Sequence, residues 1–144
     1  MKLKLPWQRG AQDDTSCPDH LQSGLWGEKE ADRMLREKGY KVLGRRVRVG
    51  RRDELDLVVR RDEVLVFVEV KTRRDESFGR PASAVDRRKQ AVLCRAAVRY
   101  LARVKQRPPH FRFDIVEVIG DPEHGLREIR HIESAFQMGP RYRL

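Results

Sequence analysis

The sequence predicts an α/β fold in which a mixed central β-sheet is flanked by helices, and three observations carry this prediction. Short apolar runs typical of strands occupy residues 40–49, 54–59, 64–71 and 111–119. Two longer segments, 24–38 and 82–105, are rich in helix-forming residues and carry an apolar stripe. The order is helix, three strands, helix, strand and strand, which predicts helices packed on the faces of one sheet.

The 144 residues suffice for one compact domain. Hydrophobic residues make up 39% and charged residues 38%, but the apolar residues come in periodic blocks, which indicates a folded chain. Residues 1–22 contain turn-forming residues without a sustained period and are expected to be a disordered extension. We expect the folded domain to span residues 23–137 and a basic tail to span residues 138–144.

The first helix should begin near Ser23 and end before Gly39, which fits a helix C-cap. A half-exposed strand follows, and then the runs 54–59 and 64–71, whose short connection predicts an antiparallel hairpin. Residues 73–81 form a polar loop before the long helix at 82–105. After the strand at 111–119, a turn at 120–125 allows residues 126–132 to pair back as an edge strand.

The net charge of +10 and the pI near 10.2 favour a polyanionic partner such as nucleic acid, although an arginine-rich proteome gives the same excess. Cys17 and Cys94 are too few and too far apart for a disulfide framework or a structural zinc site. No apolar run approaches the roughly 20 residues of a membrane span. We therefore expect a cytoplasmic protein with no membrane partner.

Charged residues end the most apolar strand. Side chains alternate along a strand, so Glu69 and Lys71 share a face with Leu65 and Phe67, while the valines at 64, 66, 68 and 70 fill the other. Burying such charges is costly unless they are paired or hold a metal. A structural salt bridge of Lys71 with an acidic neighbour is the alternative to a metal site.

The preceding strand brings further carboxylates to this position. Glu54 and Asp56 share one of its faces. We expect a four-residue hairpin loop to place Asp56 opposite Glu69, and a two-residue loop to place Glu54 there. Either register leaves two carboxylates within reach of one metal ion.

Two charged residues also lie on helix faces that should be apolar. Glu28 precedes Ala31 by three residues on the inner stripe of the first helix. Lys89 lies between Val85 and Val92 on the inner stripe of the long helix. Each alone is explained by a side chain that reaches the helix edge. Together, on faces that cover the same sheet, they indicate a shared polar site.

The remaining arginines of the long helix form a face that either follows phosphate groups or is simply solvated. They are Arg87, Arg88, Arg95, Arg99 and Arg103.

Hydrolysis of a phosphodiester uses a hard divalent cation such as Mg²⁺ on carboxylate oxygens, and an adjacent lysine can orient the water or stabilise charge.

An ordered set of short motifs carries a family resemblance. In chain order it comprises Gly27-Glu28, Gly39-Tyr40, Glu54-Leu55-Asp56-Leu57-Val58, Val66-Phe67-Val68-Glu69-Val70-Lys71, Arg73, Phe78-Gly79, Ala84-Val85, Lys89-Gln90, Tyr100-Leu101 and Arg112-Phe113-Asp114. The Asp56 and Glu69-Val70-Lys71 pattern resembles the PD-(D/E)xK nuclease motif of the restriction-endonuclease-like fold. The whole set resembles the YraN-like family of predicted bacterial endonucleases, which are similar to archaeal Holliday-junction resolvases.

The resemblance implies a role for each matching residue. Asp56 and Glu69 bind Mg²⁺ or Mn²⁺ with the Val70 carbonyl, Lys71 serves the attacking water, and Glu28 positions a water or a second ion. Asp53 departs from the family, which usually has Gly there. The implied activity is endonucleolytic cleavage of DNA, branched or flapped, by a homodimer.

Nucleic-acid contacts are assigned to Arg73, Arg87 and Arg88, and Lys89 is added to the candidate catalytic residues. Two other hypotheses stay open. One is a nucleic-acid-binding accessory module in DNA processing that has the fold but does not cleave. The other is a structural protein whose acidic cluster is a salt-bridge network.

Overall fold

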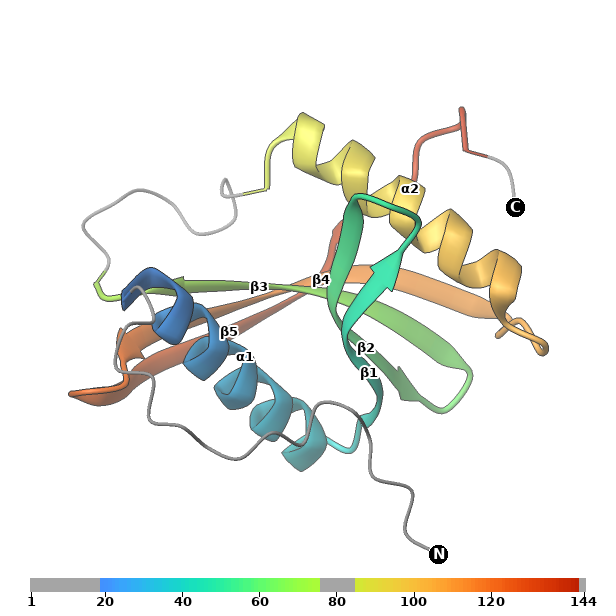
Figure 1. The fold of residues 1–144 in the computed structure, drawn as a ribbon. Coiled ribbons are helices and arrows are strands. Elements are labelled where there is room, and N and C mark those ends of the chain that lie inside the picture. Colours follow the sequence, from blue (N-terminus) through green and yellow to red (C-terminus); the bar gives the residue numbers. More distant parts are fainter. Residues whose placement is uncertain (1–18, 76–84, 143–144) are drawn as a thin grey trace, which may run out of the picture.

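The computed structural model describes residues 19–75 and 85–142, which form one five-stranded sheet with a helix on each face (Figure 1). The elements are α1 (Asp19–Glu37), β1 (Lys41–Val49), β2 (Asp53–Arg61), β3 (Val64–Arg73), α2 (Arg87–Arg103), β4 (His110–Asp121) and β5 (Gly125–Phe136). The strands lie in chain order across the sheet. Only the β3–β4 pair is parallel, because α2 crosses between these strands, so the predicted mixed α/β sheet is confirmed.

The two sheet faces carry separate hydrophobic cores. Val66 and Val68 of β3 pack with α1 residues such as Leu35, whereas Leu65 and Phe67 pack with the inner residues of α2. This division follows the two-residue alternation of β3 and confirms the predicted faces. Glu69 and Lys71 continue the α2-facing row beyond Phe67.

Helix α1 begins at Asp19, four residues before the predicted start. Gly24 suggested a boundary in the sequence, yet it lies inside the helix, where a Cβ would meet nothing within 4 Å. The acidic Asp19 in the first turn suits the positive end of the helix dipole. The predicted disordered extension is therefore wrong for residues 19–22, and residues 1–18 lie outside the described range. At the other end Gly39 adopts a φ of 89°, as predicted for a C-cap.

Helix α2 begins at Arg87, so the predicted start at residue 82 is wrong for Val85 and Asp86; residues 76–84 lie outside the described ranges. Asp86 is extended, and its carboxylate accepts a hydrogen bond from the Lys89 main-chain N–H at 2.8 Å. This N-cap starts the helix later than its apolar pattern suggests. It also fixes Lys89 in the first turn.

The β2–β3 hairpin closes with a two-residue turn, Asp62-Glu63, and Arg61 pairs with Val64. The strands are antiparallel, so the register runs from the Arg61–Val64 pair beside the turn to the Leu57–Val68 pair. The expectation that a two-residue turn would place Glu54 opposite Glu69 is therefore wrong. Continued by one residue, the observed register brings Asp56 level with Glu69.

A buried polar network supports the α1 side of β4. Asp114 is 1% exposed and accepts hydrogen bonds from Arg112, from His131 Nε2 at 2.7 Å and from the Ser134 N–H at 3.0 Å. Burial alone would raise the pKa of Asp114, but these hydrogen bonds outweigh it and lower the pKa. The network ties β4 to β5, which is longer than the predicted edge strand.

Met138 and Tyr142, which follow β5, pack on the α2 side of the sheet. Tyr142 donates a hydrogen bond to the Ala91 carbonyl at 3.2 Å, and Met138 packs against the α2-facing core. Within residues 19–75 and 85–142, neither helix is long and apolar enough to cross a membrane.

Candidate metal centre

Strand β2 leaves β3 at the position of the candidate site. Their pairing stops at Leu57 and Val68, whereas β3 stays paired with β4 as far as Arg73. The Val70 main-chain N–H donates instead to the Asp56 side-chain Oδ2 at 2.9 Å. Asp56 therefore lies where the two strands separate, with its carboxylate in place of a backbone carbonyl.

The carboxyl groups of Asp56 and Glu69 are neighbours in this gap. Burial, together with the charge of Glu69 and a hydrogen bond to it, raises the pKa of Asp56 to about 7, although the Val70 N–H opposes the shift. Glu69 is 5% exposed, and its Oε2 has no hydrogen-bond partner among the described residues. The half-buried carboxyl of Asp56 and the buried carboxyl of Glu69 offer neighbouring oxygen donors, a set that suits a hard divalent cation.

Two lysines reach the other oxygen of Glu69. The Lys71 Nζ lies 3.6 Å and the Lys89 Nζ 3.5 Å from Glu69 Oε1. Lys71 extends from β3 and Lys89 from the first turn of α2, so the structure brings together two cations that are 18 positions apart in the chain. Both side chains remain partly exposed.

Glu28 reaches the site from α1. A Cβ on the preceding Gly27 would lie 2.9 Å from the Thr72 Cβ, so only glycine lets α1 approach β3 this closely. Arg46 of β1 holds the Glu28 carboxylate, with Nε 2.7 Å from Oε2 and Nη2 3.4 Å from Oε1. Burial raises the pKa of Glu28, and Asp56 adds to the shift, although the Arg46 hydrogen bond opposes it.

The Val70 carbonyl was also assigned to the metal. The N–H and C=O of a strand residue point to the same neighbouring strand. The Val70 N–H is directed to Asp56, so its carbonyl is directed to the same gap. A pocket of about 520 Å³ adjoins this gap on the α1 side and is lined by Glu28, Val70, Thr72 and Arg74, among others.

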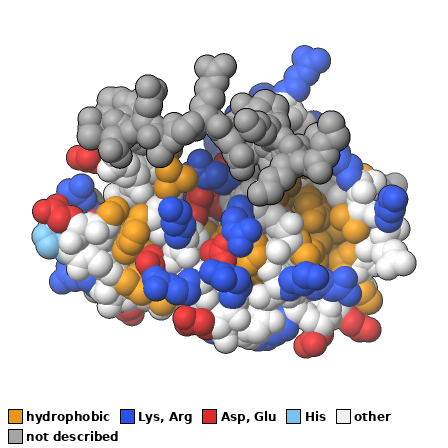
Figure 2. Space-filling view, turned by 60° about the horizontal axis from the view of Figure 1, so that its bottom comes forward, with side chains coloured by type: hydrophobic (Ala, Val, Ile, Leu, Met, Phe, Trp, Pro, Cys, Tyr) orange, Lys and Arg blue, Asp and Glu red, His pale blue; other side chains and the backbone are white. Residues whose placement is uncertain are grey.

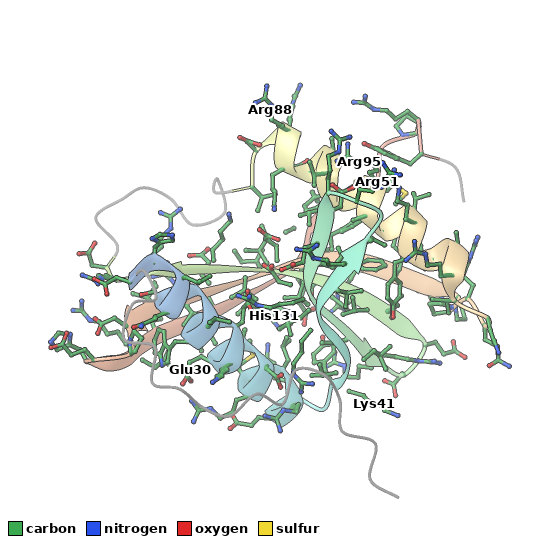
Figure 3. All side chains as sticks on the ribbon, viewed as in Figure 1. Glu30, Lys41, Arg51, Arg88, Arg95 and His131 are labelled. Atoms are coloured by element: carbon green, nitrogen blue, oxygen red, sulfur yellow. The ribbon has the colours of Figure 1, made fainter. Side chains whose placement is uncertain are left out.

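The predicted nucleic-acid contacts are dispersed. Arg73 lies on β3 two residues beyond Lys71, while Arg87 and Arg88 lie exposed in the first turn of α2. Figure 3 shows Arg88 projecting away from the sheet. The structure does not bring Arg87 and Arg88 to the carboxyl pair, although Lys89 on the same turn does reach it.

Two other arginines of the α2 face are held by Asp53, the residue that departs from the family pattern. Arg95 binds both oxygens of the Asp53 carboxylate at 2.7 Å, and Arg99 Nη1 lies 3.8 Å away. Arg95 accordingly lies beside the tip of the β1–β2 hairpin in Figure 3. The hydrogen bond from Arg95 is the largest influence that lowers the pKa of Asp53. These two arginines clamp the hairpin to α2, rather than forming an open phosphate-binding face.

Sequence reasoning missed two residues at the site. One is Arg46, whose φ is 47°. Because Arg45 pairs with Leu57 and Val47 with Leu55, Arg46 lies opposite Asp56. Glu117 of β4 is 1% exposed and pairs in register with Lys71 on the same face. A carboxylate within an apolar strand signals Glu117 in the sequence, whereas only the fold reveals Arg46.

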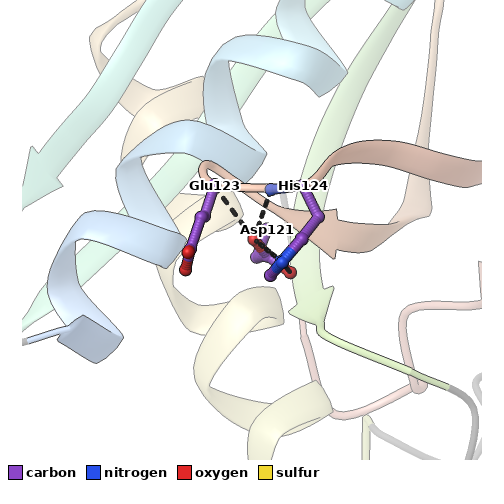
Figure 4. A group of neighbouring side chains, drawn as sticks. All are labelled: Asp121, Glu123 and His124. Atoms are coloured by element: carbon purple, nitrogen blue, oxygen red, sulfur yellow. Dashed lines mark hydrogen bonds and ion pairs between the residues drawn. The ribbon is translucent and has the colours of Figure 1, made fainter.

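A separate group of potential ligands lies in the β4–β5 turn, where Asp121, Glu123 and His124 come together (Figure 4). Asp121 Oδ1 accepts the main-chain N–H groups of Glu123 and His124 at 2.9 and 2.8 Å. This local turn explains the cluster without a metal.

The model of the uncharacterised protein family UPF0102 matches residues 27–118. A UPF0102 protein of Syntrophomonas wolfei is 47% identical over 113 residues, which is 78% of this chain and 96% of the relative. One from Symbiobacterium thermophilum is 47% identical over 78% of this chain and 94% of its own length. One from Pelobacter propionicus is 39% identical over 96% of this chain and 99% of the relative.

Proposed function

We propose that this chain, which belongs to the uncharacterised protein family UPF0102, is a Mg²⁺- or Mn²⁺-dependent DNA endonuclease of the PD-(D/E)xK type. The observation that carries the proposal is the Asp56–Glu69 carboxyl pair in the gap between β2 and β3. The pKa of Asp56 is raised to about 7, and Glu69 Oε2 has no hydrogen-bond partner within the described residues.

The residues fit a divalent cation. Lys71 and Lys89 lie 3.6 and 3.5 Å from Oε1 of Glu69. The buried Oε2, which has no hydrogen-bond partner among the described residues, could share an ion with the Asp56 carboxylate and the Val70 carbonyl. Oxygen donors of this kind suit Mg²⁺ or Mn²⁺. A bound ion would offset charge on the phosphodiester and make a water more acidic.

The cationic side chains supply the remaining chemistry. Lys71, on the exposed side of Glu69, stabilises the negative charge of the transition state or orients the attacking water. Lys89 adds a second positive charge from α2. Glu28, held by Arg46, positions a water at the α1 side.

The charge of the protein supports a nucleic-acid substrate. The net charge is +10, and Figure 2 shows Lys and Arg side chains spread over the face that carries α1, between acidic and apolar side chains. We assign phosphate contacts to Arg73, Arg87 and Arg88, which extend the positive surface away from the carboxyl pair. Branched or flapped DNA and a homodimer are the substrate and assembly that we propose from the family resemblance.

The second candidate is a nucleic-acid-binding module that does not cleave. The two lysines favour it, because they already neutralise charge on Glu69 without a metal. The experiment compares cleavage of linear, flapped and four-way DNA in Mg²⁺ or Mn²⁺ by the wild type and by Asp56→Asn, Glu69→Gln and Lys71→Met. Glu63→Gln, at the exposed hairpin turn, serves as the control.

An endonuclease should cut at least one substrate, and each site variant should lower the rate by about 10²-fold or more. DNA binding with a steep salt dependence but no cleavage would establish the binding module instead. Site variants that all cut like the wild type would place the activity elsewhere.

A further inference from the structure

Arg46 lies at the centre of the acidic groups on the α1 side of the site. Its hydrogen-bonded partner is Glu28, and the negative charges of Glu54 and Asp56 also raise the pKa of Arg46. Arg45 and Val47 pair with Leu57 and Leu55, so Arg46 is the residue of β1 that lies across from Asp56. An arginine on a neighbouring strand is thereby placed beside a candidate metal ligand.

The backbone of Arg46 is left-handed, with a φ of 47°. Residues other than glycine, asparagine and aspartate rarely adopt this conformation, and it is costly for a long side chain. The partner that it gains is Glu28, but the Arg46 side chain is 39% exposed, and ion pairs of that exposure contribute little stability. The ion pair therefore does not offset the strain, and strain of this kind concentrates at functional sites.

Among the residues that the structure describes, the Arg46 guanidinium forms hydrogen bonds only with Glu28, so it retains further N–H donors. Arginine carries five N–H donors in a rigid fork, and the contacts to Glu28 engage Nε and Nη2. The partly exposed group can hold a carboxylate on one side and a phosphate on the other. On the α1 side, where Glu28 and Asp56 add negative charge, Arg46 would attract a substrate phosphate, whereas Lys71 and Lys89 lie on the α2 side.

We propose that Arg46 binds a phosphate group of the nucleic-acid substrate on the α1 side of the site, while Glu28 holds its guanidinium in place. The phosphate lies between Arg46 and the two lysines, so that cations flank it from both faces of the sheet. This inference rests on the proposed function for its substrate class, but the binding contact does not require that the phosphate be cut.

The test compares wild type with Arg46→Asn and Arg46→Gly. Both replacements accept a left-handed backbone, so each removes the guanidinium without adding strain. Arg48→Asn is the matched control, because it removes the same charge two residues away on β1, where the arginine side chain is 83% exposed. Affinity for a fluorescent flapped DNA is measured in Ca²⁺ across a range of salt concentrations. Cleavage in Mg²⁺ and thermal unfolding are measured separately.

Both Arg46 variants should melt no lower than wild type and should weaken DNA binding about tenfold more than Arg48→Asn does. They should also reduce the salt slope by about 1, as expected for one lost phosphate contact. Equal affinities and slopes for the Arg46 and Arg48 variants would overturn the proposal, as would a wild type that binds no DNA. A wild type that binds but does not cleave, with the Arg46 effect present, would support the contact and reject the nuclease.

Discussion

Asp56 accepts the main-chain N–H of Val70 at 2.9 Å, at the point where β2 stops pairing with β3. A side-chain carboxylate there replaces a backbone rung, so the sheet opens without leaving the Val70 donor unsatisfied. The opening gives space to two carboxyls that would otherwise be enclosed between strands. The local separation of two strands thus creates the candidate metal centre.

The stability of the metal-free protein should depend on pH through Asp56. The pKa of an aspartate in the unfolded chain is 3.8, whereas the pKa of Asp56 in the folded protein is about 7. Stability from this raised pKa is fully present below 3.8 and is lost as the pH rises through about 7, because the unfolded chain releases the proton first. Urea unfolding in EDTA should show wild type losing stability relative to Asp56→Asn between these values. A constant difference between the two proteins would contradict the raised pKa.

Adding a methyl group at Gly27 should destabilise the protein by about 1–3 kcal/mol, because a Cβ there would lie 2.9 Å from the Thr72 Cβ and force α1 away from β3. Gly24→Ala on the same helix is the control. Its Cβ meets nothing within 4 Å, so it should stabilise the protein by about 0.5–1 kcal/mol. Chemical unfolding measures both, and effects of the same sign would refute the close packing.

Asp53→Asn should loosen the β1–β2 hairpin from α2. The carboxylate holds Arg95 through two bonds of 2.7 Å, so we expect a loss of about 1–2 kcal/mol after allowance for the partly exposed arginines. Glu54→Gln, whose carboxylate lies 4.0 Å from Arg48 at an exposed position, should change stability by less than about 0.5 kcal/mol. The prediction fails if urea unfolding gives equal values for the two variants.

Asp114→Asn should cost about 3–5 kcal/mol, because it removes the buried charge that pairs with Arg112 and His131. Glu133→Gln, exposed and 3.6 Å from Arg112, is the control and should have little effect. Thermal unfolding distinguishes them. A stable Asp114→Asn protein would show that the network on β4 does not support the fold.

The sequence predicted most of the fold because its periodicity is strong. The alternation along β3 separated Phe67 from Val68, and the helical spacing placed Lys89 on the face that reaches Glu69. Helix ends were less predictable. The Asp86 side chain caps α2, which therefore begins later than its apolar pattern indicates, and Gly24 lies inside α1 although the sequence suggested a boundary there.

Other features of the site depend on contacts that spacing does not encode. Asp56 lies level with Glu69 because the β2–β3 hairpin has a two-residue turn rather than a four-residue loop. The left-handed backbone of Arg46 and its hydrogen bond to Glu28 of α1 are evident only from the tertiary structure. Asp53 appeared in the sequence only as a departure from a family pattern, and its bond to Arg95 needed the tertiary structure.

The central claim is that Asp56 and Glu69 hold a divalent cation, and the most direct measurement is anomalous diffraction from a crystal soaked in Mn²⁺. We predict a peak within coordinating distance of Asp56, Glu69 Oε2 and the Val70 carbonyl, and no such peak in an Asp56→Asn crystal. A peak only at Asp121, Glu123 and His124, or no peak while both lysines stay on Glu69, would contradict the claim.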